Sequence, residues 1–275
     1  MKTLYVSDLD GTLLGGNGHA SEFTVKAVNS LIDNGLAFTF ATARSVASAA
    51  ELLKGFKMTL PAVMMNGVFL TDIPTKTQIH ACRIPVDTAR KVIDIFESCG
   101  RPPFVYTFGG EYIEAEYTKL KSDHERSFVA ARKKVYRRFA EVENYTVEGD
   151  TVFISGIDNR ETMEAVTARL QKVDGIKFSY YLDVYGKDKY YVEVYHESAG
   201  KQNGVKRLKE MYGFDRVVAF GDNENDVEVL KSADTAVVVK NGQPMAKEVA
   251  DVIIDTNDND GVAKYLLELY EKGEL

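Results

Sequence analysis

The sequence predicts an α/β fold in which a doubly wound parallel sheet is interrupted by an inserted α+β block. Single apolar runs alternate with helical patterns at both ends of the chain, whereas strand-like runs come in adjacent pairs between about residues 82 and 196. Polar or acidic residues stand where the apolar runs of the two ends stop, and ligands of open α/β sheets bind at such strand ends. We therefore expect a core domain that carries the ligand site, from residues 1–82 and 197–275, and an inserted second domain from residues 83–196.

Length, composition and charge limit the class of protein. The 275 residues are enough for one large domain or two modest ones, and a hydrophobic content of 45% is sufficient for a packed core. A net charge of -7 argues against a general binder of nucleic acid or of anionic membranes. Two cysteines cannot form a disulfide framework, and we find neither a secretory signal nor an apolar run of spanning length. These features favour a cytoplasmic protein, and the sequence leaves its oligomeric state open.

The N-terminal strand leads into the most informative stretch of the chain. Residues 4–6 form an apolar run that predicts a buried strand, and Asp8-Leu9-Asp10-Gly11-Thr12 follows it directly. Gly11 allows a sharp turn of the backbone. Ser21 can then cap a helix with one apolar face, which Gly35 would end.

Two further strands are expected before the insertion. Residues 36–41 predict the second strand, and it ends in Thr42-Ala43-Arg44. Ser45 can cap a helix that runs to about residue 54. Residues 61–65 predict a third strand, which ends in Asn66-Gly67.

The inserted block and the C-terminal part are predicted from the same kinds of pattern. In the insertion we expect a helix at residues 86–99, a hairpin of strands 104–108 and 112–117, a strand at 151–157, a helix at 162–173, and strands 177–185 and 190–195 around a turn at 186–189. After it we expect a helix at residues 201–212 that begins at Lys201, a strand at 217–220 that ends in Gly221-Asp222-Asn223-Glu224-Asn225-Asp226, short strands at 236–239 and 252–254, a simple turn at Asp258-Asn259-Asp260-Gly261, and a last amphipathic helix.

Known loop motifs do not account for the acidic stretch at the N-terminus. A calcium loop of the EF-hand type counted from Asp8 would need Gly at its sixth position and Glu at its twelfth, where Leu13 and His19 stand. A dinucleotide-binding fingerprint around residues 16–21 lacks its third Gly, because position 21 is Ser. A phosphate-binding P-loop ending at Lys201 lacks its first Gly. A simple polar turn remains the alternative for Asp-Gly alone.

Convergence of strand ends favours a metal site over a turn. The carboxyl ends of parallel strands share one edge of the sheet, so the polar side chains that follow them are expected to lie together. Oxygen ligands of this kind favour magnesium. The residues expected at this edge are Asp8, Asp10, Thr42, Asn66, Asp222, Asn225 and Asp226.

A carboxylate at such a site can act as a nucleophile toward phosphorus, which divides one difficult displacement into two easier ones. Asp8 is well placed for this role, but like charges repel, by about 4 kcal/mol at about 4 Å in an effective dielectric of about 20. Lys201 and magnesium are the expected sources of compensating charge. Thr42 can donate a hydroxyl hydrogen bond to phosphate, and the backbone N–H groups of Leu9 and Ala43 can do likewise.

Taken together, these motifs resemble the haloacid dehalogenase-like phosphohydrolases, and within them the Cof-type branch that has a large α/β cap and contains many sugar-phosphate phosphatases. The resemblance rests on Asp8-Leu9-Asp10-Gly11-Thr12, Thr42, Lys201 and residues 221–226, and it covers the full chain. It departs from the usual pattern at three places. Ala43 replaces a common Gly, Gln202 follows Lys201 where the family usually has Gly, and Val239-Lys240-Asn241-Gly242 differs from the stretch usual there.

The resemblance implies that Asp8 is the nucleophile and that Asp10 is the general acid and base. It implies that magnesium is held by Asp8, the carbonyl of Asp10 and Asp222, and that Asn225 and Asp226 support the metal and the phosphate from nearby. Arg44 and Asn66 either contact substrate, as matching positions do in the family, or merely cap the helix and turn that follow them.

The expected function is hydrolysis of a small phosphorylated metabolite, in particular a sugar phosphate, by a magnesium-dependent phosphatase through an aspartyl-phosphate. The inserted domain would close over the site and select the substrate. Two alternatives stay open: a phosphomutase or phosphotransferase that uses the same intermediate, and a catalytically silent protein that binds sugar phosphates.

Overall fold

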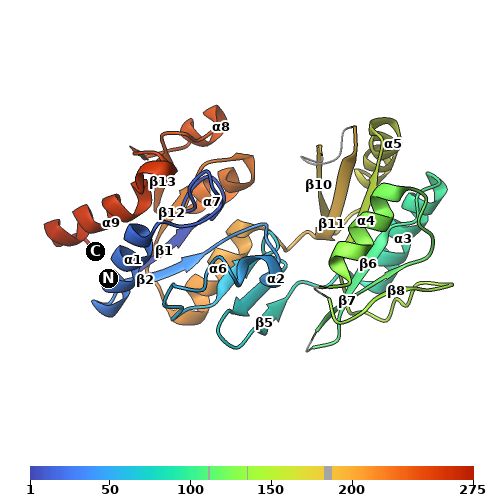
Figure 1. The fold of residues 1–275 in the computed structure, drawn as a ribbon, viewed down its shortest axis with the longest axis horizontal. Helices are drawn as coiled ribbons and strands as arrows, with labels where there is room; N and C mark the ends of the chain where they lie inside the picture. Colours follow the sequence, from blue (N-terminus) through green and yellow to red (C-terminus); the bar gives the residue numbers. More distant parts are fainter. Residues whose placement is uncertain (111, 135, 183–187) are drawn as a thin grey trace. The chain divides into compact units, whose positions relative to one another are not determined.

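The computed structural model describes residues 1–110, 112–134, 136–182 and 188–275, and within these the chain forms two compact units (Figure 1). The first unit consists of Met1–His80 and Gly200–Leu275, and the second of Ala81–Ala199. The boundaries expected from the sequence lay after residues 82 and 196. Residues 183–185 of an expected strand and 186–187 of the turn after it lie outside the described residues.

A five-stranded parallel sheet forms the centre of the first unit, in the order β14-β13-β12-β1-β2. Its strands are β1 (Thr3–Ser7), β2 (Ala37–Phe40), β12 (Arg216–Gly221), β13 (Thr235–Val239) and β14 (Val252–Ile254). Ser7 at the end of β1 lies opposite Phe40 on one side and Phe220 on the other. The residues that follow β1, β2 and β12 therefore leave the sheet at the same edge, and the predicted parallel core is confirmed.

Helices cover both faces of this sheet, as the alternation of side chains along β1 requires. Leu4 and Val6 pack in one apolar cluster with side chains of α6 (Lys201–Tyr212) and α7 (Val227–Ser232). On the other face, α1 (Glu22–Asp33) packs against α9 (Gly261–Lys272), whose Tyr265 contacts the ring of Phe220. Figure 1 shows α1 and α9, coloured blue and red, next to each other beside the two chain ends.

The helix predicted from residue 45 to about residue 54 is shorter than expected. Ser45 does cap it, because its side chain accepts a hydrogen bond from Ser48 N, but α2 ends after four residues (Val46–Ala49). Residues 50–55 form turns instead. Asn29 of α1 holds the end of this segment, since its side chain donates to the Gly55 carbonyl and accepts from Lys57 N.

The third predicted strand exists, but it does not extend the parallel sheet as a full member. β3 (Ala62–Met64) belongs to a separate three-stranded sheet with β4 (Phe69–Asp72) and β5 (Thr77–Ala81), which we did not expect from the sequence. A single parallel bridge between Ala41 and Val63 joins it to the end of β2. Residues 65–67 reverse the chain between β3 and β4, and all three have positive φ angles. Asn66 and Gly67 are residue types that tolerate positive φ, and an Asn-Gly pair is typical of a hairpin turn, but we expected the pair only as the end of a strand.

The second unit is a six-stranded sheet in the order β10-β11-β9-β6-β7-β8, in which only β7 and β8 pair in parallel among the pairings described. The helices α3 and α5 pack on one face of this sheet in a shared apolar core. The predicted α+β character of the insertion is thus confirmed. The element bounds are α3 (Val86–Ser98), β6 (Phe104–Phe108), β7 (Ile113–Tyr117), α4 (Asp123–Arg132), β8 (Phe139–Glu141), β9 (Thr151–Asp158), α5 (Arg160–Leu170), β10 (Ile176–Leu182) and β11 (Tyr190–His196).

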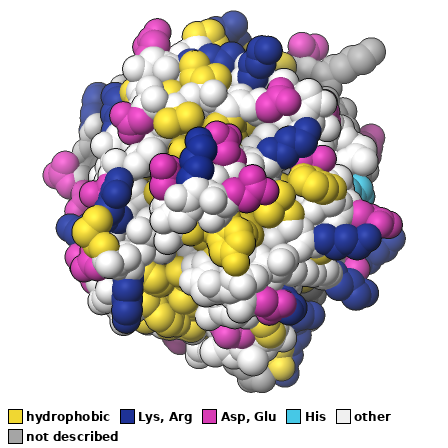
Figure 2. Space-filling model, turned by 90° about the vertical axis from the view of Figure 1, so that its left-hand side faces the viewer, with side chains coloured by type: hydrophobic (Ala, Val, Ile, Leu, Met, Phe, Trp, Pro, Cys, Tyr) yellow, Lys and Arg dark blue, Asp and Glu magenta, His cyan; other side chains and the backbone are white. Residues whose placement is uncertain are grey.

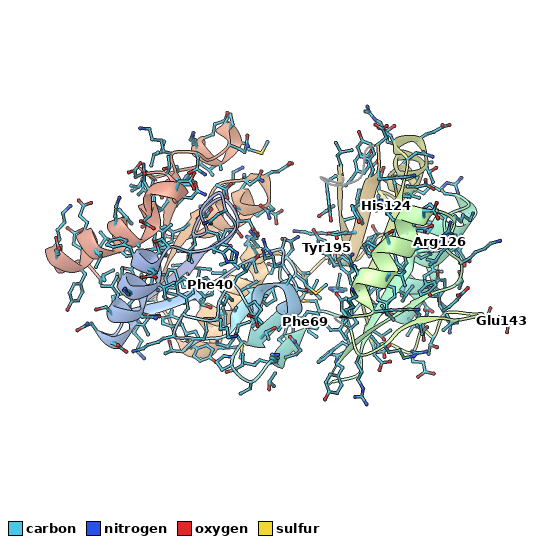
Figure 3. All side chains as sticks on the ribbon, in the orientation of Figure 1. Phe40, Phe69, His124, Arg126, Glu143 and Tyr195 are labelled. Atoms are coloured by element: carbon cyan, nitrogen blue, oxygen red, sulfur yellow. The ribbon has the colours of Figure 1, made fainter. Side chains whose placement is uncertain are left out.

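Each unit has its own buried aromatic residues. Phe40 and Phe69, labelled in Figure 3, are almost fully buried in the first unit, and Tyr195 is buried in the second. On the face shown in Figure 2, basic and acidic side chains are interspersed with small apolar areas. Within the described part of the chain, we find no helix with both the length and the apolar character needed to span a bilayer.

Candidate active site

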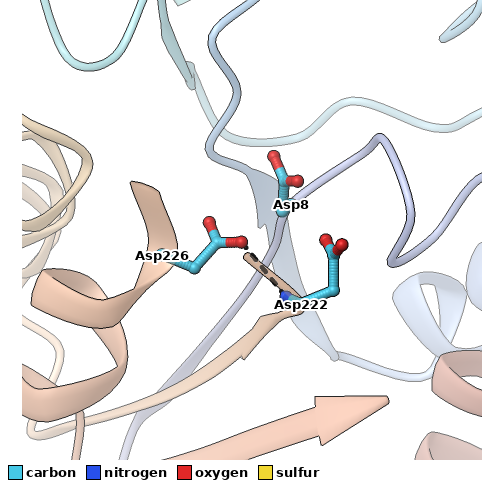
Figure 4. A group of neighbouring side chains, drawn as sticks. All are labelled: Asp8, Asp222 and Asp226. Carbon is cyan, nitrogen blue, oxygen red and sulfur yellow. Dashed lines mark hydrogen bonds between the residues drawn. The ribbon is translucent and has the colours of Figure 1, made fainter. Parts of the chain in front are cut away.

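Three carboxylates meet at the edge of the parallel sheet where β1 and β12 end. Oxygen atoms of Asp8, Asp222 and Asp226 lie within 4.8 Å of one another (Figure 4). The pairing of β1 with β12 explains the first two, because Asp8 N donates to Phe220 O and Asp222 directly follows the last residue of β12. Asp8 is buried, whereas Asp222 is partly exposed. The edge predicted from the sequence therefore carries a compact acidic group.

Lys201 joins two of these carboxylates from the start of α6. Its Nζ lies 2.7 Å from Asp8 Oδ1 and 2.7 Å from Asp226 Oδ1, and all three side chains are at most 7% exposed. Such a buried ammonium group, hydrogen-bonded to two carboxylates, is a fixed positive charge beside Asp8.

Asp226 holds this arrangement together. Its Oδ1 accepts from Lys201, and its Oδ2 accepts from the backbone N–H groups of Asp222, at 3.1 Å, and of Asn223, at 3.2 Å. The bond to Asp222 is the dashed line in Figure 4. Since both oxygens of Asp226 already accept hydrogen bonds, this side chain fixes the positions of Lys201 and of the loop that carries Asp222.

Asp222 is oriented by the loop that follows β1. Thr12 Oγ1 donates to Asp222 Oδ1 at 2.7 Å. Gly11, with φ of 78°, permits this approach, because a Cβ atom at this position would lie 2.5 Å from Asp222 Oδ2. Thr12 belongs to the motif recognised in the sequence, but its partner could not be identified there.

Burial and the charges nearby shift the pKa values of the group. Burial, together with the neighbouring Asp226, raises the pKa of Asp8 to about 7, although Lys201 and a hydrogen bond from Leu9 N–H oppose the shift. Burial also raises the pKa of Asp222. Burial acts to lower the pKa of Lys201, but Asp8 and Asp226 outweigh it and hold that pKa above its ordinary value. Lys201 is therefore a permanent cation, and further positive charge beside Asp8 would favour ionisation of its carboxyl group.

The loop after β2 forms a second side of the site. Thr42 is buried; its N–H donates to Val63 O, and its Oγ1 accepts from Arg44 N at 3.1 Å. The Arg44 guanidinium group makes two bonds to Asp10, Nε to Oδ2 and Nη2 to Oδ1, each 2.6 Å long. Asp10 is thus paired with Arg44, and its carboxylate is not part of the acidic group found among the described residues. No pattern in the sequence indicated this pairing.

Asn66 and its neighbours bring the β3–β4 turn to the same edge. Asn66 N donates to Thr42 O, and its Oδ1 is buried without a hydrogen-bond partner in the described structure. Gly67, with φ of 84°, lies so close to the Gly200 backbone that a Cβ atom would collide with it. Gly200 precedes Lys201, so this contact places the start of α6 against the turn.

The remaining predicted residues occupy different positions. Leu9 is buried, and its carbonyl accepts hydrogen bonds from the N–H groups of residues 12–14. Its own N–H donates a hydrogen bond to the Asp8 carboxyl group. Ala43 is exposed on the loop after β2. Asn225 is exposed on the short helix η1 (Glu224–Asp226). The structure assigns no partner role to these two side chains.

Two asparagines and an aspartate that the sequence did not single out brace the loop after Asp10. Asn241 Nδ2 donates to Gly11 O, and Asn257 Nδ2 donates to Leu14 O, each at 2.8 Å. Asp258 accepts from Gly16 N at 2.6 Å. Asn241 belongs to the stretch that departs from the usual family pattern, and Asp258 to the stretch expected as a simple turn, so no local signal indicated these contacts.

The acidic group has the composition of a site for a hard divalent cation. All three side chains offer carboxylate oxygen, the donor type that Mg²⁺ prefers. When all are ionised, Lys201 balances only one of the three negative charges, so the group carries an excess that a divalent cation would cancel. The residues present therefore fit the predicted metal.

A separate pocket of about 560 Å³ is located at the other end of the first unit. Its walls include Met1, Tyr5, Leu36 and Leu275, near the beginning of β1 and not its end. It contains none of the acidic residues, so its size does not bear on the chemistry of the carboxylate group.

Comparison with known proteins gives matches along most of the chain. A family model described as haloacid dehalogenase-like hydrolase matches residues 5–266. The 5-amino-6-(5-phospho-D-ribitylamino)uracil phosphatase YitU of Bacillus subtilis is 28% identical over 280 residues, which cover 97% of this chain and 97% of that protein.

Solved structures share the fold. A phosphatase of the HAD enzyme superfamily from Bacteroides thetaiotaomicron superimposes with a TM-score of 0.77 at 19% identity, and the match covers 100% of this chain and 96% of the other. A sugar phosphatase of HAD subclass IIB gives a TM-score of 0.72 at 18% identity over 100% of both chains.

Proposed function

The chain belongs to the haloacid dehalogenase-like hydrolases, and from this membership and the geometry of its acidic group we propose that it is a magnesium-dependent phosphatase of a small phosphorylated metabolite. One observation carries the proposal: a buried lysine bonds a buried aspartate at the end of β1, beside two further carboxylates. This arrangement provides a nucleophile, a fixed cation and a set of metal ligands within one small volume.

Asp8 is the proposed nucleophile. One of its oxygens forms a bond to phosphorus while the bond between phosphorus and the leaving oxygen breaks, which gives an aspartyl-phosphate. Lys201 Nζ, 2.7 Å from Asp8 Oδ1, reduces the repulsion between the carboxylate and the phosphate. Thr42, Ala43, Asn66 and the backbone of Leu9 are proposed to bind the phosphate oxygens from the loops at this edge.

Magnesium, held by Asp8, Asp222 and the carbonyl of Asp10 with support from Asn225 and Asp226, would supply positive charge against the phosphate. The charge excess of the carboxylates supports this assignment. Thr12 and Asp226 keep the Asp222 side chain and its loop in place through their hydrogen bonds.

Asp10 is the proposed general acid and base. It would give its proton to the leaving oxygen in the first step and take a proton from the attacking water in the second, after which inorganic phosphate leaves and Asp8 is restored. Its position two residues after Asp8, on a loop braced by Asn241 and Asn257, supports this role.

The proposed substrate is a sugar phosphate or a phosphorylated compound of similar size. This part of the proposal is supported by the structural neighbour described as a sugar phosphatase and by the relative whose named substrate is a phosphoribityl compound. We propose that the second unit selects among such substrates, as caps and lids do in other enzymes.

A screen of phosphorylated metabolites tests the proposed function. The purified protein is incubated with sugar phosphates, phosphoribityl compounds and p-nitrophenyl phosphate, with magnesium and with excess chelator, and released phosphate is measured. We expect turnover of at least one ester with magnesium and a loss of at least about 100-fold with chelator, since several kcal/mol of charge stabilisation are removed. Turnover that chelator leaves unchanged would contradict the metal assignment, and no turnover of any ester would contradict the function.

Magnesium affinity is expected to depend on pH through Asp8. The pKa of this carboxyl group is raised by burial to about 7, from an ordinary value of 3.8, so it holds a proton below about pH 7 that the metal must displace. Affinity should therefore weaken by about tenfold per pH unit as the pH falls below about 7.

The same shift affects the stability of the metal-free protein. The free energy of unfolding falls as the pH rises from 3.8 to about 7, because in this range the native state holds the proton on Asp8 and the unfolded state does not.

Calorimetric titrations with magnesium at about pH 6, 7 and 8 measure the pH dependence of the magnesium affinity. The Asp8→Asn variant is the matched control, because it cannot gain or lose the proton and should show a weaker but flatter profile. Equal affinity of the unaltered protein at the three pH values would contradict the assignment of Asp8 as a metal ligand with a raised pKa.

A further inference from the structure

Arg44 and Asp10 form an ion pair at the site, and the proposed mechanism assigns this pair no role. Two N–H groups of one guanidinium fork meet the two oxygens of one carboxylate, each over 2.6 Å. Bidentate pairs of this kind fix the orientation of the carboxylate as well as its position. The two side chains are 32% and 51% exposed, so the pair lies at the open side of the site.

Arg44 is held by backbone contacts that do not involve Asp10. Its N–H donates to Thr42 Oγ1 at 3.1 Å, and its carbonyl accepts from Met65 N at 3.0 Å. These contacts anchor the start of the side chain to the ends of β2 and β3. The guanidinium group therefore extends from a fixed base toward Asp10, on the loop after β1.

Asp10 has less support of its own. Its carboxylate is not in the acidic group formed by Asp8, Asp222 and Asp226 among the described residues, and the hydrogen bonds found for it there are those from Arg44. A general acid must meet the leaving oxygen in one orientation, and a half-exposed aspartate without a partner would sample several.

We infer that Arg44 is the positioning residue of Asp10: its fork sets the place and orientation from which Asp10 serves the leaving oxygen. This inference rests on the proposed function. The resemblance leaves open a different role, in which Arg44 contacts the substrate directly. A positioning role would affect proton transfer by Asp10, whereas direct contact would affect binding of the phosphoryl group, which all substrates share.

The step affected is the first one. The Asp8 oxygen bonds to phosphorus, the bond from phosphorus to the leaving oxygen breaks, and Asp10 gives its proton to that oxygen. While Asp10 carries this proton, one of its oxygens donates to the leaving oxygen and the other accepts from Arg44; once the proton has left, both oxygens accept from the fork, which is the arrangement of the structure. An alkyl oxygen needs this proton, whereas p-nitrophenolate leaves without it. Because the leaving group departs in the first step, kcat/KM reports this step for both kinds of ester.

The test compares Arg44→Met and Arg44→Lys with the unaltered protein on p-nitrophenyl phosphate and on the best alkyl phosphate of the screen. General acid catalysis contributes about 10²–10⁴-fold, so partial loss of positioning should lower kcat/KM for the alkyl ester at least about tenfold more than for the aryl ester. Arg44→Lys should not restore the alkyl activity, because an ammonium group cannot bond both oxygens in the geometry of the fork.

A double-mutant cycle with Asp10→Asn completes the test. Asp10→Asn should show the same preference for the aryl ester. Addition of Arg44→Met to Asp10→Asn should lower kcat/KM for the alkyl ester by less than about a further twofold, since Arg44 then has no acid to position. Lys54→Met is the surface control, because it removes an exposed cation beyond the end of α2, and it should change the turnover of neither ester.

The outcomes separate the two roles. Equal losses on both esters, full rescue by Arg44→Lys, or losses of Arg44→Met and Asp10→Asn that multiply in the double variant would overturn the positioning role and assign Arg44 to the phosphoryl group. Absence of turnover by the unaltered protein on every ester would instead overturn the proposed function, and this inference with it.

Discussion

Replacement of Asp8 by Asn is expected to lower kcat for every substrate by roughly 10⁴-fold or more, because an amide cannot form the covalent intermediate. Asp8 is the buried carboxylate at the end of β1 that Lys201 bonds at 2.7 Å. The amide keeps the size and one oxygen of the side chain, so the change removes the nucleophile with little change of shape.

A loss of activity could also follow from a weaker metal site, and Asp222→Asn separates the two causes. Asp222 belongs to the same acidic group but is not the proposed nucleophile. Raising magnesium to saturation should restore much of the activity of Asp222→Asn and none of that of Asp8→Asn. Activity of Asp8→Asn within about tenfold of the unaltered protein at saturating magnesium would contradict the nucleophile assignment.

The fold of the Asp8→Asn variant should remain intact. Burial raises the pKa of Asp8, which means that its ionised form is disfavoured in the metal-free protein. Lys201 keeps its second partner, Asp226, at 2.7 Å. We therefore expect a thermal midpoint in chelator equal to or above that of the unaltered protein at about pH 8. A clear fall of the midpoint would indicate that the activity loss reflects misfolding.

The edge of the sheet that carries the site could be predicted from the sequence, because apolar runs indicated the strands that end there. Apolar runs mark β1 and β12 by composition alone, and parallel strands place their carboxyl ends together whatever the rest of the fold does. Asp8 and Asp222 could therefore be expected to meet, although one follows the first strand of the chain and the other follows the inserted unit. The helix that begins at Lys201 was likewise indicated by composition, because Gly200 precedes it and Gly213 follows it.

The contacts that orient these side chains could not be predicted, since they depend on loops. The Arg44–Asp10 pair, the bond from Thr12 to Asp222 and the bracing by Asn241 join loops whose paths carry no periodic signal. The β3–β4 turn was missed for a related reason. Asn66-Gly67 is a pair typical of hairpin turns, but the turn also holds Met65 at positive φ, which local preference does not favour and surrounding contacts must impose.

Replacement of Lys201 by Met is expected to affect both stability and activity, because it leaves two carboxylates buried without their cation. Lys201 is the hydrogen-bonded partner of both Asp8 and Asp226, and all three side chains are nearly inaccessible to solvent. Removing one partner from a buried ion pair typically costs about 3–5 kcal/mol. We expect a loss of this size in the free energy of unfolding of the metal-free protein at about pH 8, measured by urea denaturation.

The control and the pH dependence show whether charge is the cause. Lys206→Met alters an exposed lysine on the same helix and should change the free energy of unfolding by less than about 0.5 kcal/mol. The deficit of Lys201→Met should shrink as the pH falls from about 8 to about 5, because uptake of protons by the carboxylates removes the uncompensated charge. Activity should stay low even at saturating magnesium, since a metal ion bound by Asp8 and Asp222 does not replace the ammonium group between Asp8 and Asp226. A variant as stable as Lys206→Met at the higher pH would show that the buried ion pair contributes no net stability and that Lys201 serves catalysis alone.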